Sequence, residues 1–299
     1  MHQHHNPTAK SPVKNLSRAF QIGIVINIVY VLAEALAGIF TNSMGLLSDA
    51  AHNLSDVVTL VLALTAFKLS GMQVSRRFTY GYKKSTILIS FLNAMIICMA
   101  VVFIVVESVE KIIHPQVLQG GIVSVVAAIG VLINGFTAYL FVKDSKRDLN
   151  VKSVFFHMLA DTLISVGVVI SGIIISFTGW YILDGLIGLA VVIAIVVATW
   201  DLFRESVRLV LDGVPANVDY EEVIRGCLHV EGVVDMHHLH IWALSTTENA
   251  LTTHVIIKDL SEMEHIKIQI KDFLKNQGIS HVTLEFETPD SLCEEIKCE

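Results

Sequence analysis

The sequence predicts an integral membrane protein in which a bundle of six transmembrane helices precedes a small C-terminal α+β domain. Hydrophobic residues make up 53% of the 299 positions and charged residues only 16%, whereas soluble domains carry about 25% charged residues. Six apolar runs have about the 20 residues that a helix needs to cross a bilayer. Asp and Glu outnumber Lys and Arg by 16 to 6 from Gly213 onward, against 12 to 15 before it. This asymmetry indicates two parts in different surroundings.

The apolar runs define the predicted spans and, with them, the domain boundaries. We place the spans at Phe20–Phe40, Leu46–Leu69, Ser85–Val106, Gly121–Val142, Val154–Phe177 and Ile182–Leu202. The predicted organisation is a polar tail at 1–18, a transmembrane domain at 19–212 and a metal-binding domain at 213–299. The tail lacks the layout of a cleavable signal peptide.

Basic residues in the connections predict the orientation of the spans. They gather in the second and fourth connections, at Lys68, Arg76, Arg77, Lys83, Lys84, Lys143, Lys146, Arg147 and Lys152. The first and fifth connections contain none, and the third contains only Lys111. Because basic residues accumulate on the cytoplasmic side, we expect both termini in the cytoplasm and the protein in the inner or plasma membrane of the cell.

The segment after Gly213 has the pattern of a compact α+β domain with element order αββαβ. The expected elements are a helix near Asp219–Val230, strands near Val234–Leu244 and Ala250–Lys258, a helix near Ser261–Asn276 and a strand near His281–Glu287. Ser261 and Glu264 have the spacing of a capping box. Such a unit forms a sheet with helices on one face, the open ferredoxin-like arrangement.

Two spans contain the motif His-x-x-x-Asp, as His52 with Asp56 in the second and His157 with Asp161 in the fifth. On a helix this spacing places both side chains on one face, one turn apart. Two such helices supply two nitrogen and two oxygen ligands, which suits a tetrahedral zinc site. The alternative is a hydrogen-bonded polar network, but an Asp at the centre of a span costs at least about 2.5 to 3.5 kcal/mol. Because two spans each bear this cost, we favour a metal site.

Further polar residues lie within the spans. Asp49 is one turn before His52 and shares the face of the motif. It either lines the entry path of the ion or bonds to a neighbouring helix. For Glu34, Asn27, Asn93 and Asn134, which also lie in spans, hydrogen bonding between helices is the interpretation we favour.

Seven of the thirteen histidines follow Gly213. Strand alternation predicts that His237 projects to one face of its strand and that His238 and His240 project to the other, so the three do not serve one ion. His2, His4 and His5 belong to a polar tail or gather metal, and the composition leaves both readings open.

The four cysteines are too few for a disulfide framework. Cys293 and Cys298 are spaced more widely than a zinc-binding C-x-x-C pair. They are expected as free thiols, with a metal relay as the alternative, since thiolates bind zinc and cadmium.

Four motifs resemble the cation diffusion facilitator family of metal exporters. They are the stretch Asn42–Asp56, the second His-x-x-x-Asp, the junction Leu211–Pro215 and the segment His237–Trp242. The resemblance covers nearly the whole chain. It is greatest to the branch that exports zinc, cadmium and cobalt, which has a His and an Asp on each of two helices.

The resemblance implies a homodimeric metal/proton antiporter that holds the ion at His52, Asp56, His157 and Asp161. It also implies regulatory zinc at a cytoplasmic site, for which His237, His254 and Glu287 are the main candidates and His281, Glu285 and His265 the weaker ones. The sequence departs from the family at Thr86, where a Glu is usual, so the resemblance implies no gating role for this position.

The predicted function is therefore export of a divalent cation, zinc first and cadmium or cobalt also, by alternating access. No G-x-x-x-x-G-K loop indicates use of ATP, and neither an enzymatic reaction, an organic cofactor nor a nucleic acid is expected; membrane lipid, metal ions and protons are the partners. One alternative is a membrane-anchored zinc sensor. Another is an intramembrane zinc hydrolase, which needs an open coordination position.

Overall fold

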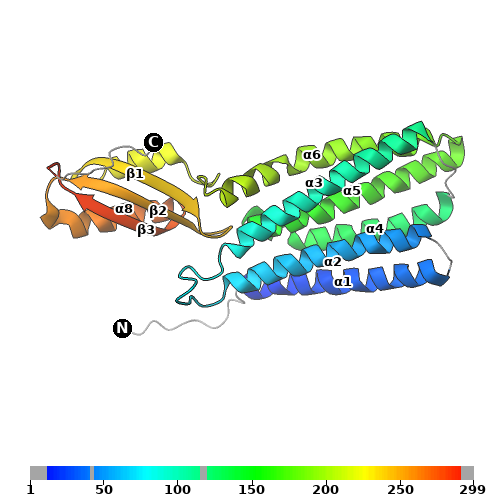
Figure 1. Cartoon of the computed structure of the whole chain (residues 1–299), viewed down its shortest axis with the longest axis horizontal. Helices are drawn as coiled ribbons and strands as arrows, with labels where there is room; N and C mark the ends of the chain where they lie inside the picture. The colour runs from blue at the N-terminus through cyan, green and yellow to red at the C-terminus, as the bar shows by residue number, and fades with distance from the viewer. Residues whose placement is uncertain (1–11, 41–43, 115–119, 291–299) are drawn as a thin grey trace.

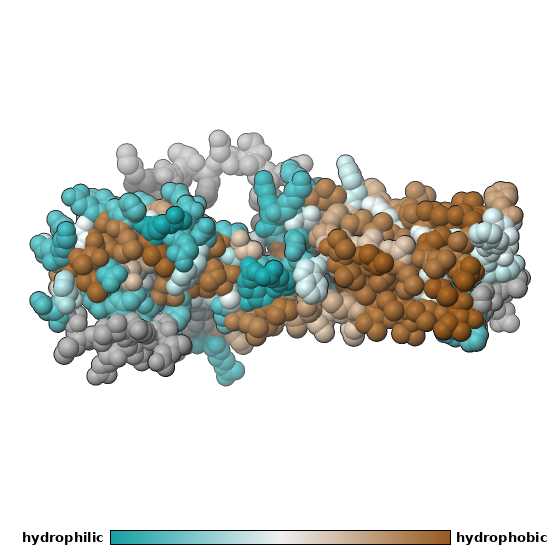
Figure 2. Space-filling model, turned by 90° about the horizontal axis from the view of Figure 1, so that it is seen from above, coloured by the Kyte–Doolittle hydropathy of each residue, from teal (hydrophilic) through white to brown (hydrophobic). Residues whose placement is uncertain are grey.

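The computed structural model describes residues 12–40, 44–114 and 120–290, and the side chains of some helical residues, Asp49 and His52 among them, lie outside this description. The molecule is elongated, with a bundle of long helices at one end and a small unit of strands and helices at the other (Figure 1). On the face seen in Figure 2, hydrophobic residues cover most of the bundle, and polar side chains are more frequent on the other part.

Within the described residues, six long helices form the bundle. They are α1 Pro12–Phe40, α2 Met44–Ser70, α3 Ser85–Ile113, α4 Gly120–Phe141, α5 Leu149–Thr178 and α6 Ile182–Val210. Within the described residues, α1, α3, α5 and α6 contain stretches long and apolar enough to cross a membrane, and α4 contains a shorter one. The chain is thus a multi-pass membrane protein.

Several helices are longer than the predicted spans. The third ends at Ile113, the fifth begins at Leu149 and the sixth continues to Val210. An apolar run marks the part of a helix that suits hydrocarbon, whereas the helix itself continues until its backbone is capped.

Polar side chains join the helices inside the bundle. The Asn27 amide donates to Thr137 Oγ1 at 3.1 Å, which links α1 to α4. The Asn93 amide donates to Ser153 Oγ at 3.3 Å, which links α3 to α5. The expected role of these two asparagines is confirmed. Asn134 is also buried, and its amide oxygen has no hydrogen-bond partner within the described part of the chain.

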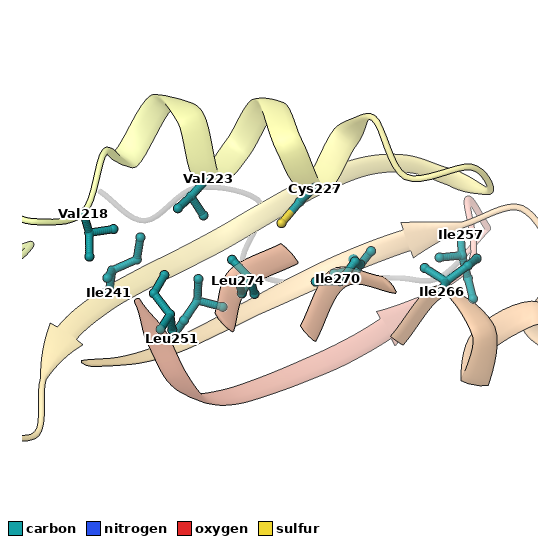
Figure 3. Packing of buried hydrophobic residues seen from close by; sticks show 11 residues of the cluster. Val218, Val223, Cys227, Ile241, Leu251, Ile257, Ile266, Ile270 and Leu274 are labelled. Atoms are coloured by element: carbon teal, nitrogen blue, oxygen red, sulfur yellow. The ribbon is translucent and has the colours of Figure 1, made fainter. Parts of the chain in front are cut away.

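The C-terminal unit has the predicted element order. Its elements are α7 Tyr220–Leu228, β1 Val233–Ala243, β2 Asn249–Ile257, α8 Met263–Asn276 and β3 Ile279–Glu287. The strand order is β1-β2-β3, with β1 and β2 antiparallel and β2 and β3 parallel. Both helices pack on one sheet face around a separate core that includes Val223, Cys227, Ile241, Leu251, Ile266, Ile270 and Leu274 (Figure 3). The other sheet face carries neither helix.

The predicted capping box of α8 is wrong. The helix begins at Met263 after a short 3₁₀ turn, and Asp259 caps that turn by accepting a hydrogen bond from the Ser261 backbone N–H at 2.8 Å. This bond lowers the pKa of Asp259. Glu264 instead pairs with Lys267 on the helix surface. Asp259, two residues before Ser261, therefore accepts the capping hydrogen bond that the sequence pattern assigned to the serine.

The turn between β1 and β2 touches the bundle where α3 and α5 begin. The backbone N–H of Thr246 donates to Thr86 Oγ1 at 3.1 Å, and its hydroxyl donates to Asp148 Oδ1 at 2.7 Å. An ion pair between Lys83 and Glu248 flanks this contact. Thr86, the position at which the chain departs from the resembling family, therefore joins the two parts of the molecule.

Asp148 is the N-cap of α5 and should influence stability in a pH-dependent way. Its carboxylate also accepts the Asn150 N–H at 2.8 Å, and burial raises the pKa of Asp148 above its usual 3.8. The folded state therefore binds the proton more readily than the unfolded state. The resulting stability is present below the unfolded value and lost as the pH rises through the folded value.

Replacing Asp148 with Asn keeps an oxygen for both donors and removes the charge. We expect Asp148→Asn to melt at the same temperature as the wild type at low pH and at a higher one at neutral pH. Asp148→Ala should lose about 1 kcal/mol of helix-cap stabilisation. Thermal melts of the purified full-length protein from about pH 4 to about pH 8 check this. A wild-type advantage over Asp148→Asn that grows with pH would contradict it.

Candidate metal centres

Within the bundle, α2 and α5 bring three of the predicted ligands together. His157 Nε2 lies 3.2 Å from Asp56 Oδ1 and 3.7 Å from Asp161 Oδ2. One ligand atom from each of the three residues lies within 4.8 Å of the others. All three side chains are buried, with 0%, 4% and 6% of Asp56, His157 and Asp161 exposed. A buried imidazole between two carboxylates can bind a divalent cation.

The local sequence explains why these side chains converge. His157 and Asp161 are four residues apart on α5 and therefore share one helix face. The Asn150 amide donates to the Ala63 carbonyl oxygen at 3.1 Å and fastens α5 to α2 between the site and the C-terminal unit. The register of the two helices is thus fixed close to the site.

Two further predicted residues of this site lie on α2. His52 is four residues before Asp56, and Asp49 is seven residues before it. The side chains of His52 and Asp49 are outside the described part of the chain. The predictions made for them stay predictions.

A second cluster lies on the helix-free face of the sheet. His254 Nδ1 is 2.6 Å from Glu287 Oε1, and His237 Nε2 is 3.6 Å from Glu287 Oε2. His237 and His254 are directly opposite each other on β1 and β2, and their ring centroids are 5.0 Å apart. The ligand atoms of His237, His254 and Glu287 lie within 4.8 Å of one another. Two nitrogens and a carboxylate suit zinc.

The prediction that His238 projects away from His237 is wrong. The pairing of β1 with β2 shifts between His237 and His240, and His238 has a φ of 54°. Met236 and Leu239, on either side of the shift, both pack against the core. The extra residue of this β-bulge interrupts the alternation, so His238 shares the face of His237 and its ring centroid lies 5.3 Å from that of His254.

The weaker candidates separate into near and distant residues. Glu285 Oε2 lies 3.5 Å from His254 Nε2, beside the cluster. His281 instead packs edge-on against the ring of Tyr80, with centroids 5.3 Å apart, and His265 on α8 lies 3.0 Å from the amide of Gln269. Neither joins the cluster among the described residues.

The cysteines of the described part contribute no ligand to either cluster. Burial raises the pKa of Cys227 to about 11, so this core thiol stays protonated at neutral pH and lacks the thiolate that binds metal. Cys293 and Cys298, with the tail residues His2, His4 and His5, lie outside the described residues.

A multi-pass helical bundle with ionisable residues buried in its interior is typical of membrane proteins that move ions or protons. Comparison with models of known protein families places the chain within that class. Residues 20–211 match the model of the cation efflux transmembrane domain, and residues 215–289 match that of the cation efflux protein cytoplasmic domain. The chain belongs to the cation efflux, or cation diffusion facilitator, family, as the resemblance implied.

Characterised bacterial relatives align with nearly the full length. The cadmium, cobalt and zinc/H(+)-K(+) antiporter of Bacillus subtilis is 32% identical over 96% of this chain and 92% of the relative. The metal cation efflux system protein CzcD of Cupriavidus metallidurans is 33% identical over 96% and 89%. The zinc transporter ZitB of Escherichia coli is 30% identical over 96% and 92%.

Proposed function

We propose that this protein exports zinc, and also cadmium or cobalt, in exchange for protons by alternating access. The single observation that carries the proposal is the buried convergence of Asp56, His157 and Asp161 between α2 and α5. The family and the names of the relatives point to the same class of substrate. The activity is transport, and no bond of a substrate is broken.

His52 is the proposed fourth ligand. It completes two nitrogens and two oxygens, the number and type of donors that favour tetrahedral zinc. Four protein ligands also leave no open position for a water nucleophile, which argues against the zinc hydrolase. Asp49 is one turn further from the cytoplasmic domain than His52. Both proposed roles of Asp49 stay open, an entry path for the ion and a bond to a neighbouring helix.

Protons compete with the cation for this site. A histidine binds metal only in its neutral form, and an unperturbed imidazole titrates near about 6.5. Protonation from the far side of the membrane releases the ion and returns the carrier with protons bound. The proton gradient is then the energy source for export.

All six long helices are proposed to span the membrane, because α2 and α4 pack against α1 and α5, which carry apolar spans. The C-terminal unit at one end of the bundle is cytoplasmic, by its family match. With six spans, an even number, both termini are proposed to lie in the cytoplasm. The proposed location is the inner or plasma membrane of the cell. The proposed segments are a tail at 1–18, a membrane domain at 19–212 and a metal-binding domain at 213–299.

The cytoplasmic domain is proposed to bind regulatory zinc at His237, His254 and Glu287 and to contribute to a homodimer. The fit rests on the donor set, since two imidazoles and a carboxylate meet on an open sheet face. The sensor alternative assigns function to this cluster alone. It gives no function to the His and the two Asp that are buried in the bundle, although burying them there is energetically costly.

Metal uptake by proteoliposomes tests the proposed function. Zinc, cadmium, cobalt and manganese are compared under an imposed pH gradient of either direction. We expect zinc, cadmium and cobalt to be carried against the proton flow, with manganese carried least. Liposomes that bind zinc through the protein and show no metal flux would instead support the sensor.

Selectivity should depend on the nitrogen ligands, because imidazole suits zinc and cobalt while oxygen-only sites suit harder ions such as manganese. His52→Asp keeps a ligand at the same helix position. We expect it to retain transport and to lower the zinc-to-manganese flux ratio by roughly tenfold. Flux assays of both proteins with each metal give the ratio. An unchanged ranking of the metals, with wild-type rates, would remove His52 from the ligand set.

A further inference from the structure

A buried carboxylate outside both metal clusters lies in the transmembrane part of α1. Glu34 is 5% exposed, and its two oxygens are held from different directions. The Asn53 amide donates to Oε2 at 2.7 Å, and the Tyr30 hydroxyl donates to Oε1 at 3.4 Å. An acidic side chain within a span is costly and is by default functional.

The contacts of Glu34 lie along the half of the ion site that is further from the cytoplasmic domain. Its partner Asn53 is three residues before Asp56 on α2, a helix that runs toward the cytoplasmic domain (Figure 1). Three residues of helix correspond to about 4.5 Å. Asn53 therefore holds the carboxylate about 4.5 Å along the helix axis from Asp56, on the side away from the cytoplasmic domain and next to the position of His52.

The other partner faces the second ligand helix. A methyl group added at Gly130 of α4 would lie 3.4 Å from the Tyr30 hydroxyl and 3.3 Å from Ser165 Oγ. Ser165 is one turn beyond Asp161 on α5. Both hydroxyls therefore lie beside Gly130. Glu34 is joined to α2 through Asn53, and its other partner, Tyr30, lies next to the same glycine as Ser165 of α5.

The geometry points to Glu34 as a relay ligand that accepts the divalent cation after it leaves the four-residue site. This inference rests on the proposed export function. A dication that lost all four ligands at once inside the bundle would bear the full cost of an uncompensated buried charge. A carboxylate beside the outer half of the site lets the ion exchange its ligands one at a time. The Asn53 and Tyr30 donors hold that carboxylate in place before the ion arrives.

The relay and a purely structural role make different predictions for Glu34→Gln. The amide oxygen of Gln still accepts the Asn53 hydrogen bond, so a structural role predicts normal flux. A relay requires the charge. We expect zinc flux in proteoliposomes to fall about 10-fold to 100-fold, while the zinc affinity of the membrane site stays within about threefold. Glu34→Asp, which restores the charge, should recover part of the flux.

Affinity is measured by calorimetry on the full chain in a His237→Ala, His254→Ala background, so that only the membrane site is titrated. Asn27→Ala, which removes a hydrogen bond of the same helix, is the matched control and should keep flux within about twofold. Glu34→Met, of similar length and apolar, replaces Glu34→Gln if that variant elutes or melts abnormally, with the same expected loss of flux and the same retained affinity.

Wild-type flux in Glu34→Gln or in its replacement Glu34→Met would overturn the inference, and so would a loss of zinc affinity as large as that of His157→Ala. An equal loss of flux in Asn27→Ala would assign the effect to helix packing and overturn it as well. Absence of flux in the wild-type protein would instead refute the proposed function itself.

Discussion

His157→Ala should remove at least about 99% of zinc transport while the protein still folds and inserts. His157 Nε2 lies between Asp56 and Asp161, at 3.2 Å and 3.7 Å from their oxygens. Removing only an outer partner of a metal ligand costs roughly 10-fold to 100-fold in affinity or activity. Loss of a ligand should cost at least that much. Initial rates of zinc uptake by proteoliposomes measure the effect.

Asp161→Asn should have an effect of the same size, because it keeps the shape of the side chain and removes its charge. The His157→Ala, Asp161→Asn double variant should be little worse than either single variant, since residues that act as one site are not additive. Thr162→Ala is the control. It is adjacent on α5 and bonds only to the Met158 carbonyl among its described contacts, so its flux should remain close to that of the wild type. Substantial zinc flux in either single variant would remove these residues from the transport site.

Loss of His237 and His254 together should lower zinc binding by the isolated cytoplasmic domain by at least about tenfold. The two rings converge on Glu287. The domain has its own hydrophobic core (Figure 3), so residues 213–299 should fold when expressed alone. Isothermal calorimetry gives the affinity, and the full-length double variant should still transport zinc because the membrane site is intact.

The matched control replaces His265 and His281, two histidines of the same domain that lie away from the cluster. That variant should bind zinc as the wild type does. Equal affinities of the wild type and the His237, His254 double variant would show that the cluster is not the zinc site. Loss of transport in the full-length double variant would show that the cluster is more than regulatory.

The parts of this molecule that follow from local periodicity could be predicted from the sequence. The spacing of His157 and Asp161 places them on one face of any helix, and the cost of charge in a membrane makes that face point inward. The order of helices and strands could also be predicted, because the spacing of apolar residues differs between helices and strands.

Features that depend on how elements pair could not be predicted. The position of His238 requires a β-bulge and a left-handed backbone in a residue other than Gly, which no local pattern encodes. The contact of Glu34 with Asn53 depends on the rotation of α1 against α2. The contact of Thr246 with Thr86 and Asp148 depends on how the β1–β2 turn meets the bundle.

Simultaneous measurement of zinc and proton flux tests the central claim most directly. Full-length protein is reconstituted with a zinc-sensitive and a pH-sensitive dye inside the vesicles, and zinc is added outside. Zinc entry should be accompanied by proton exit in a fixed ratio, and both should be absent in His157→Ala vesicles. Zinc entry without proton movement, or undiminished flux of both ions in His157→Ala, would contradict the account.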